Sequence, residues 1–284
     1  MLFDKFRLND LQMQALKTTL YAVCAGAFGL FARWMQLMLA FDDSDLPKSS
    51  AWNLLFPMVV VAAVIISIHF SRDAGRHHYV LPEGFTEAFA FTSPVVNAVR
   101  YAAGGLMIIG AVLLLLTCET EKHAVMMRIL AGLGVLSGIS YPLMLGMAQN
   151  KDSNPNLRCL CAALPIVMFS FWLILTYKMN DINSVEWDYG IEILADCVGI
   201  YSFFRMAGFA FDVPNTKRSM FWAMFAPFCF FVCLADDRLL GMQVMYVAAA
   251  VMMLLNNWIF VCNLKKDESS EAARTEPDDG FERL

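Results

Sequence analysis

Long apolar runs follow one another along almost the whole chain, each close to the ~20 residues that cross a bilayer as a helix. Short polar segments separate them, which leaves no room for a separate soluble domain. The pattern predicts an all-α, polytopic integral membrane protein with about eight transmembrane helices, over residues 16–41, 52–70, 95–118, 124–148, 159–177, 189–211, 220–235 and 239–262. We expect these helices to form one transmembrane domain over residues 1–264.

Composition agrees with this class. The 284 residues are 58% hydrophobic and 17% charged, whereas soluble domains are about 25% charged. Asn9 and Gln12 fit a helix-capping box, so we expect the first helix to begin near Asp10. Residues 265–284 are polar and mostly acidic, and they cannot bury enough apolar surface to fold alone. They are predicted to form a disordered cytoplasmic tail, with a partner-binding tail as the alternative.

The distribution of Lys and Arg predicts orientation, because cytoplasmic loops carry an excess of these residues. If the N-terminus is cytoplasmic, eleven lie inside, namely Lys5, Arg7, Lys17, Arg72, Arg76, Lys151, Arg158, Lys217, Arg218, Lys265 and Lys266. Five lie outside: Lys48, Lys122, Arg128, Lys178 and Arg238. We therefore expect both termini in the cytoplasm and, for location, a plasma (cytoplasmic) membrane.

Two distant segments resemble each other. Residues 29–57 align without a gap on residues 199–227, with matches at Gly29/Gly199, Ala40/Ala210, Phe41/Phe211, Asp42/Asp212, Ser49/Ser219, Trp52/Trp222 and Pro57/Pro227. The predicted helices of the two segments run in opposite directions, which indicates an inverted repeat of the kind found in secondary transporters. The eight predicted helices would then form a 3+2+3 inverted layout, in which two groups of three helices have opposite orientations and two further helices lie between them. The alternative is that apolar helices resemble one another through composition alone.

Charged residues inside the predicted helices are the first candidate site. Glu192 and Asp196 are four residues apart on one helical face, whereas Arg205 points almost the opposite way. Arg33 lies at a depth similar to that of Asp196. Since a charge at mid-helix costs at least ~2.5–3.5 kcal/mol, we expect Arg33 to neutralise Asp196 or Glu192. The predicted outer polar layer comprises Arg33, Gln36, Glu192 and Asp196.

A second polar group falls in the predicted cytoplasmic half. This inner polar cluster comprises Asn97, Arg100, Tyr141, Arg205, Asn256 and Asn257. It contains two guanidinium groups and no membrane-embedded carboxylate. Because Arg binds carboxylate and phosphate well, a small anionic solute or a lipid headgroup is the predicted ligand. The alternative is that both arginines extend to the interface.

Several features bear on packing and motion. Gly134 and Gly138 have the spacing that allows close helix contact, and Pro57, Pro142, Pro165 and Pro227 would interrupt four helices. Residues 83–91 are either a solvated loop or a short interfacial helix whose Phe85, Phe89 and Phe91 enter the lipid boundary.

The sequence contains none of the common motifs for nucleotide binding, hydrolysis or metal binding that we considered. The chain has no phosphate-binding GxxxxGK[ST], no HExxH and no Gly-x-Ser-x-Gly, the signatures of common nucleotide and hydrolase sites. Cys159 with Cys161 and the His77–His78 pair do not suggest a metal site. We expect no catalytic residue, metal or cofactor. The expected partner is the lipid bilayer, and no nucleic-acid partner is expected.

These features favour a secondary transporter or permease for a small solute, and the two arginines of the inner polar cluster favour an anionic one. The alternative is a non-transporting membrane protein, such as an assembly partner, a lipid-binding regulator or a sensor, whose polar residues specify helix packing. A membrane enzyme acting on a lipid-linked substrate is a weaker third candidate, because no nucleophile or metal set is evident.

Overall fold

A computed structural model describes residues 10–40, 51–73, 79–80, 82, 84–121, 123–150, 153–180 and 186–266. The long helices are α1 (Asp10–Leu39), α2 (Ala51–Asp73), α4 (Pro94–Thr117), α5 (Ala124–Met147), α6 (Pro155–Met179), α7 (Glu186–Ala210), α8 (Thr216–Val232) and α9 (Leu240–Cys262). Shorter elements are β1 (Tyr79–Val80), α3 (Phe85–Phe89), η2 (Cys118–Thr120), η3 (Cys233–Ala235) and β2 (Lys265–Lys266).

The prediction of a polytopic helical membrane protein is confirmed. In the described part of the chain, eight helices are long and apolar enough to cross a membrane. Helix α1 is described from Asp10 onward, and the predicted capping residue Asn9 lies outside the described residues. Helix α6 begins at Pro155, where the side chain of Asn154 accepts a hydrogen bond from the backbone N–H of Asn156, a typical helix cap. The predicted tail begins at residue 265, but Lys265–Lys266 form β2 and pair with Tyr79–Val80 of β1. Residues 267–284 lie outside the described residues.

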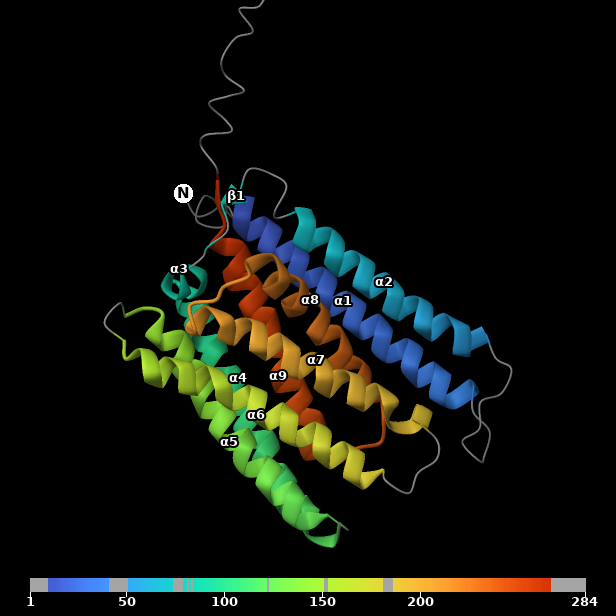
Figure 1. Ribbon diagram of the computed structural model, residues 1–284. Coiled ribbons are helices and arrows are strands. Elements are labelled where there is room, and N and C mark those ends of the chain that lie inside the picture. Colours follow the sequence, from blue (N-terminus) through green and yellow to red (C-terminus); the bar gives the residue numbers. More distant parts are fainter. Residues whose placement is uncertain are drawn as a thin grey trace, which may run out of the picture.

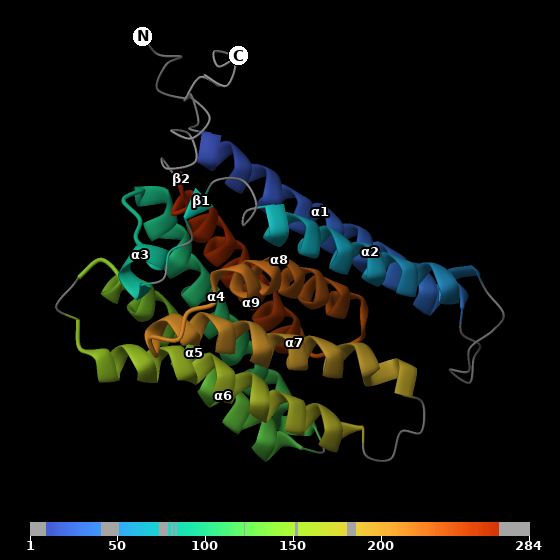
Figure 2. The same cartoon turned by 45° about the horizontal axis from the view of Figure 1, so that its top comes forward.

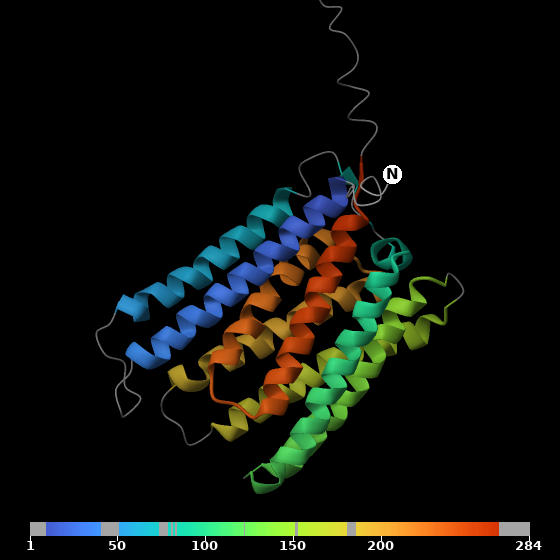
Figure 3. The same ribbon diagram turned by 180° about the vertical axis from the view of Figure 1, so that it is seen from behind.

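The helices form an antiparallel bundle with α9 at its centre (Figures 1 and 3). Helix α9 contacts α1, α4 and α8, while α5, α6 and α7 complete one side and α2 lies against α1 and α8. Figure 2 shows that α1 begins and α9 ends at the same end of the bundle. We call this the terminal end and the other the distal end. Which side of a membrane each end faces remains a prediction.

One face of α2 is apolar and uncovered by the rest of the protein. Leu54, Met58, Val61 and Ile65 follow one another at intervals of three or four residues and are all exposed. This spacing places them on a single helical face. In a bilayer, such a face contacts acyl chains, which explains why this largely apolar helix remains at the edge of the bundle.

Glycines bring helices α4, α5 and α9 into close contact. A Cβ atom added to Gly138 would lie 2.7 Å from the carbonyl oxygen of Gly104. A Cβ atom on Gly241 would lie 2.6 Å from Cα of Leu114. Because no side chain intervenes at these points, the backbones approach closely, as small residues allow in membrane helices.

Within the segment 83–91, residues Phe85–Phe89 form the short helix α3, but its two phenylalanines do not enter lipid. Phe85 and Phe89 of α3 are buried within the protein, with exposures of 3% and 0%. The Phe89 ring lies 5.6 Å from that of Phe209 and 5.1 Å from that of Phe260. The prediction of lipid contact is therefore wrong for these two residues: α3 folds back over the terminal end, where α7 and α9 bury their rings.

Helices α2, α5, α6 and α8 each contain the predicted internal proline. The segments of the proposed repeat form α1–α2 and α7–α8. Antiparallel helix pairs occur throughout the bundle, so finding one in each segment does not distinguish a repeat from ordinary bundle packing. The inverted repeat remains a prediction.

Candidate functional site

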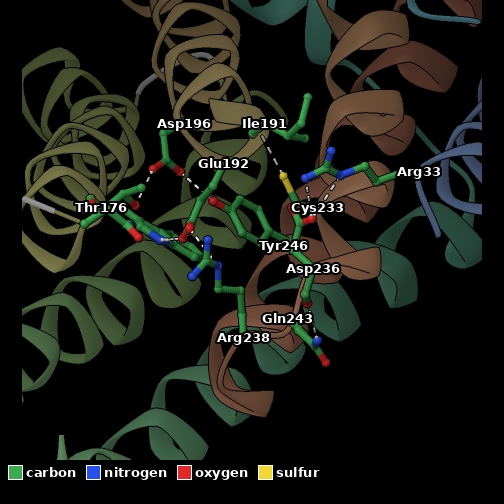
Figure 4. A network of polar contacts seen from close by, with 12 residues as sticks. Arg33, Thr176, Ile191, Glu192, Asp196, Cys233, Asp236, Arg238, Gln243 and Tyr246 are labelled. Atoms are coloured by element: carbon green, nitrogen blue, oxygen red, sulfur yellow. Dashed lines mark hydrogen bonds and ion pairs between the residues drawn. The ribbon is translucent and has the colours of Figure 1, made fainter. Parts of the chain in front are cut away.

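The candidate site is a buried polar network near the distal end, and α7 supplies its two acidic residues. Glu192 and Asp196 lie one turn apart on α7, with exposures of 2% and 0%. Both carboxyl groups point toward side chains of α6, α9 and the connection before α9 (Figure 4). Their shared face was predicted from the four-residue spacing, and their partners come from other helices.

Asp196 has two neutral hydroxyl partners. The Thr176 hydroxyl on α6 donates to Oδ2 over 3.1 Å, and the Tyr246 hydroxyl on α9 donates to Oδ1 over 2.7 Å. Within the described residues, no basic side chain forms an ion pair with Asp196. Each carboxyl oxygen is therefore hydrogen-bonded, yet the group has no direct counter-charge.

Glu192 does have a counter-charge. Its Oε2 lies 2.9 Å from Nε of Arg238, and its Oε1 accepts a 3.3 Å hydrogen bond from the indole N–H of Trp172. Arg238 lies on the short connection between η3 and α9, so this ion pair ties the connection to α7. The Cys233 thiol of η3 adds a 3.6 Å contact to the carbonyl oxygen of Ile191.

Arg33 pairs with Asp236, which corrects the predicted pairing with Asp196 or Glu192. Its Nε and Nη2 each lie 3.1 Å from Oδ1 of Asp236, and its Nη1 donates to Gln36 over 3.0 Å. Arg33 and Asp236 are 1% and 5% exposed. Asp236 follows the predicted end of its helix, so comparing depths of mid-helix residues overlooked it. The connection instead folds inward and presents Asp236 to α1.

The network continues to α2. Gln36 donates to the side-chain oxygen of Asn53 over 3.3 Å, and Gln243 of α9 donates to the Asp236 carbonyl over 3.2 Å. The four residues predicted to form the outer polar layer therefore lie in two adjoining parts of the network. Arg33 and Gln36 lie in one, Glu192 and Asp196 lie in the other, and residues 236–238 connect them.

Stacked aromatic rings surround the network. The Trp172 and Tyr246 rings are 4.2 Å apart, and Phe169 lies 5.7 Å from Trp172, 5.6 Å from Phe203 and 5.4 Å from Phe230. Phe169 and Phe203 are displaced along their helices toward the terminal end. They place an aromatic layer between Asp196 and the terminal half of the bundle.

The predicted inner cluster does not form one site. The Tyr141 hydroxyl lies 2.9 Å from the Met252 carbonyl oxygen and 3.1 Å from Oδ1 of Asn256. The neighbouring Asn257 donates instead to the Thr18 hydroxyl of α1 over 3.1 Å. These residues link α9 to two different helices.

The remaining members of this cluster are separate. Asn97 is exposed. Arg100 is 8% exposed, stacks 4.6 Å from the Tyr101 ring centre and 5.3 Å from that of Phe91, and donates to the Tyr101 hydroxyl. Arg205 stacks over Tyr201 and Phe204 of its own helix. The two arginines therefore face different surroundings.

Sequence reasoning missed several residues of the network, among them Trp172, Thr176, Asp236, Arg238 and Tyr246. Asp236 and Arg238 belong to the sequence ADDRL between two apolar runs, which is typical of a solvated turn. The other three resemble ordinary residues of an apolar helix. The one sequence feature that could have indicated Asp236 and Arg238 is the short length of this turn, because a short turn keeps its charged side chains close to the helix ends.

The exposures of Arg238 and Glu192 predict an asymmetric response. We expect Arg238→Ala to destabilise the protein more than Glu192→Gln in unfolding measurements in detergent. Arg238→Ala leaves a carboxylate that is 3% exposed, whereas Arg238 is 14% exposed and can extend toward water when its partner is neutral. Equal losses of stability in the two variants would show that the lost tie between the connection and α7, rather than the burial of an unpaired charge, determines the effect.

Comparisons with known proteins identify no relative: no family model matches the chain, and neither the curated proteins nor the solved structures include a match. The chemistry of the site is therefore argued from its own residues.

Proposed function

We propose that this multi-pass membrane protein is a proton-coupled secondary transporter for a small anionic solute. The observation that carries the proposal is Asp196, a fully buried carboxyl group held by two hydroxyl groups. Buried ionisable residues in membrane helices commonly mark ion or proton pathways.

Charge balance supports proton exchange at Asp196. Among the described residues, the network contains three carboxyl groups and two guanidinium groups, and two ion pairs join Arg33 to Asp236 and Arg238 to Glu192. An ionised Asp196 adds a negative charge to a buried site, where an uncompensated charge costs several kcal/mol. Binding a proton removes that charge, and releasing it restores the charge.

The groups that face Asp196 are consistent with this role. Thr176 on α6 and Tyr246 on α9 donate to it. Glu192 lies one turn away on α7, and Arg238 and the Cys233 thiol come from the α8–α9 region. A second acid so close to Asp196 makes simultaneous ionisation of both costly, which favours one exchangeable proton.

Arg100 supports an anionic solute. Its Nε and Nη1 atoms are buried without a hydrogen-bond partner, and no carboxylate of the described chain pairs with it. A buried guanidinium without an anion is costly, so a carboxylate or phosphate group would complete its interactions. The internal prolines of α2, α5, α6 and α8 would supply places where the bundle changes shape between inward-open and outward-open forms.

The second candidate is a non-transporting assembly partner, lipid-binding regulator or sensor. The stacked aromatic layer around Phe169 favours it, because such packing obstructs a path between the two ends. In this case the charged network would specify which helices pack together.

Proton flux in reconstituted vesicles separates the two candidates. We would enclose a pH-sensitive dye, add phosphate, succinate or glutamate outside, and follow internal pH. We expect flux that depends on one of these anions with the native protein and no such flux with Asp196→Asn, which preserves the shape of the side chain. Glu119→Gln is the matched control, since Glu119 is exposed at the distal end.

Unchanged coupled flux in folded Asp196→Asn would refute its role as the proton site. Failure of every anion to move protons through the native protein would favour the non-transporting candidate.

A further inference from the structure

A pocket of about 440 Å³ lies beside the terminal half of α7. Its walls come from α6, α7 and the turn before α8. It is lined by Ala163, Ile166, Phe204, Arg205, Ala207, Gly208, Phe211, Val213 and Asn215. Arg205 and Asn215 alone among these contribute polar side chains, so the lining contains one charged group, one amide and otherwise apolar residues.

Arg205 has no acidic partner within the described residues. One of its terminal nitrogens donates to the Tyr201 hydroxyl of the same helix, and its Nε is buried without a hydrogen-bond partner. The guanidinium lies 4.7 Å from the Tyr201 ring centre. Stacking and a neutral hydroxyl position the group, but its positive charge is not neutralised.

Nearby Arg158 provides a useful contrast. It donates from Nε and Nη2 to the Ala210 carbonyl oxygen, at 3.2 and 2.9 Å, and lies 3.4 Å from a carboxylate oxygen of Asp212. Arg158 therefore satisfies the end of α7 and has an acidic neighbour. Arg205 lies five residues before Ala210 on α7, which is about 7.5 Å further from the end of that helix. Arg205, rather than Arg158, lines the pocket.

The rim of the pocket is apolar and uncovered. Phe204, Phe211 and Val213 line it and are 54%, 53% and 74% exposed. On the side of a membrane bundle, exposed apolar residues contact acyl chains. The pocket therefore combines a cation inside with an apolar rim, which matches the two parts of an anionic lipid.

We propose that this pocket binds an anionic phospholipid, with Arg205 contacting the headgroup phosphate and Phe204, Phe211 and Val213 contacting the acyl chains. Arg is well suited to phosphate because it is always charged and presents several planar donors. Interhelical basic pockets near a membrane surface commonly bind phosphorylated headgroups. The site is separate from the Asp196 network, so the proposal does not depend on transport.

The test is lipid binding by the purified, full-length protein, measured by native mass spectrometry and by the thermal unfolding temperature in detergent. Phosphatidic acid and phosphatidylcholine would be titrated separately, and inorganic phosphate would serve as the soluble anion. We expect phosphatidic acid to bind and raise the unfolding temperature. We expect Arg205→Gln to weaken its binding at least tenfold.

Arg218→Gln is the matched control, because Arg218 is an exposed arginine at the same end and does not line the pocket. It should bind phosphatidic acid as the native protein does. Ala163→Phe provides a second test, since it fills the pocket from α6 while retaining Arg205, and it should also weaken binding.

Equal binding of phosphatidic acid by native protein, Arg205→Gln and Ala163→Phe would overturn the proposal. So would equal binding of phosphatidylcholine. Stabilisation by inorganic phosphate that matches stabilisation by phosphatidic acid would assign the pocket to a soluble anion and equally reject the lipid assignment. If Arg205→Gln fails to fold, Ala163→Phe decides the outcome.

Discussion

Replacing Arg33 with leucine is expected to lower the free energy of unfolding by about 3–5 kcal/mol, the usual effect of removing one partner from a buried ion pair. The substitution leaves the carboxylate of Asp236 buried at 5% exposure without the guanidinium that lies 3.1 Å away. Reversible unfolding in mixed micelles would measure the loss. Arg128→Leu is the control, because Arg128 is exposed on α5, and it should change stability by less than about 0.5 kcal/mol.

Two double variants test whether the partner is correctly assigned. Arg33→Leu with Asp236→Leu should be less destabilised than the sum of the single variants, because the pair is removed together. Arg33→Leu with Asp196→Asn should show additive losses, since the hydrogen-bond partners of Asp196 are Thr176 and Tyr246. Coupling of Arg33 to Asp196 instead of Asp236 would contradict the observed network.

Adding one methyl group at Gly104 is expected to destabilise the bundle by about 1–3 kcal/mol, the typical cost of overpacking a close contact. A Cβ atom there would clash with the carbonyl oxygen of Gly138 and lie 3.1 Å from Cδ of Pro142. Backbone atoms cannot rotate aside as a flexible side chain can, so α4 and α5 would have to separate. Unfolding measurements on Gly104→Ala would determine the cost.

The adjacent glycine gives an unusually close control. A Cβ atom on Gly105 would meet nothing within 4 Å, although both glycines lie in the same turn of α4. Gly105→Ala should therefore be neutral or slightly stabilising, because alanine favours helix over glycine. Similar destabilisation by both substitutions would show that α4 tolerates no alanine for reasons other than the contact with α5.

The arrangement divides the molecule into two regions with different chemistry. Near the distal end, charged residues from several helices neutralise one another and leave Asp196 with neutral partners. In the terminal half, Arg100 and Arg205 occupy separate surroundings without a carboxylate from the described chain. A coupling site in the first region and anion-binding sites in the second would be consistent with the proposed transporter, and the lipid site would remain if transport were excluded.

The sequence by itself determined the class and the helices. A run of about 20 apolar residues is stable in a bilayer as a helix regardless of its neighbours, because each backbone group bonds within the helix. This explains why residues 124–148 predict α5 and why residues 239–262 predict α9. The shared face of Glu192 and Asp196 was also predictable, since helical periodicity places residues four apart together.

Only the tertiary structure decided which charges pair. The partner of Arg33 lies 203 residues away in sequence, on a short connection whose charges are typical of a solvated turn. Whether such a turn faces water or folds inward depends on the positions of α1, α7 and α9 together. Helix periodicity is a local property, whereas the partner of a buried charge depends on distances between helices, and those distances arise only when the bundle packs.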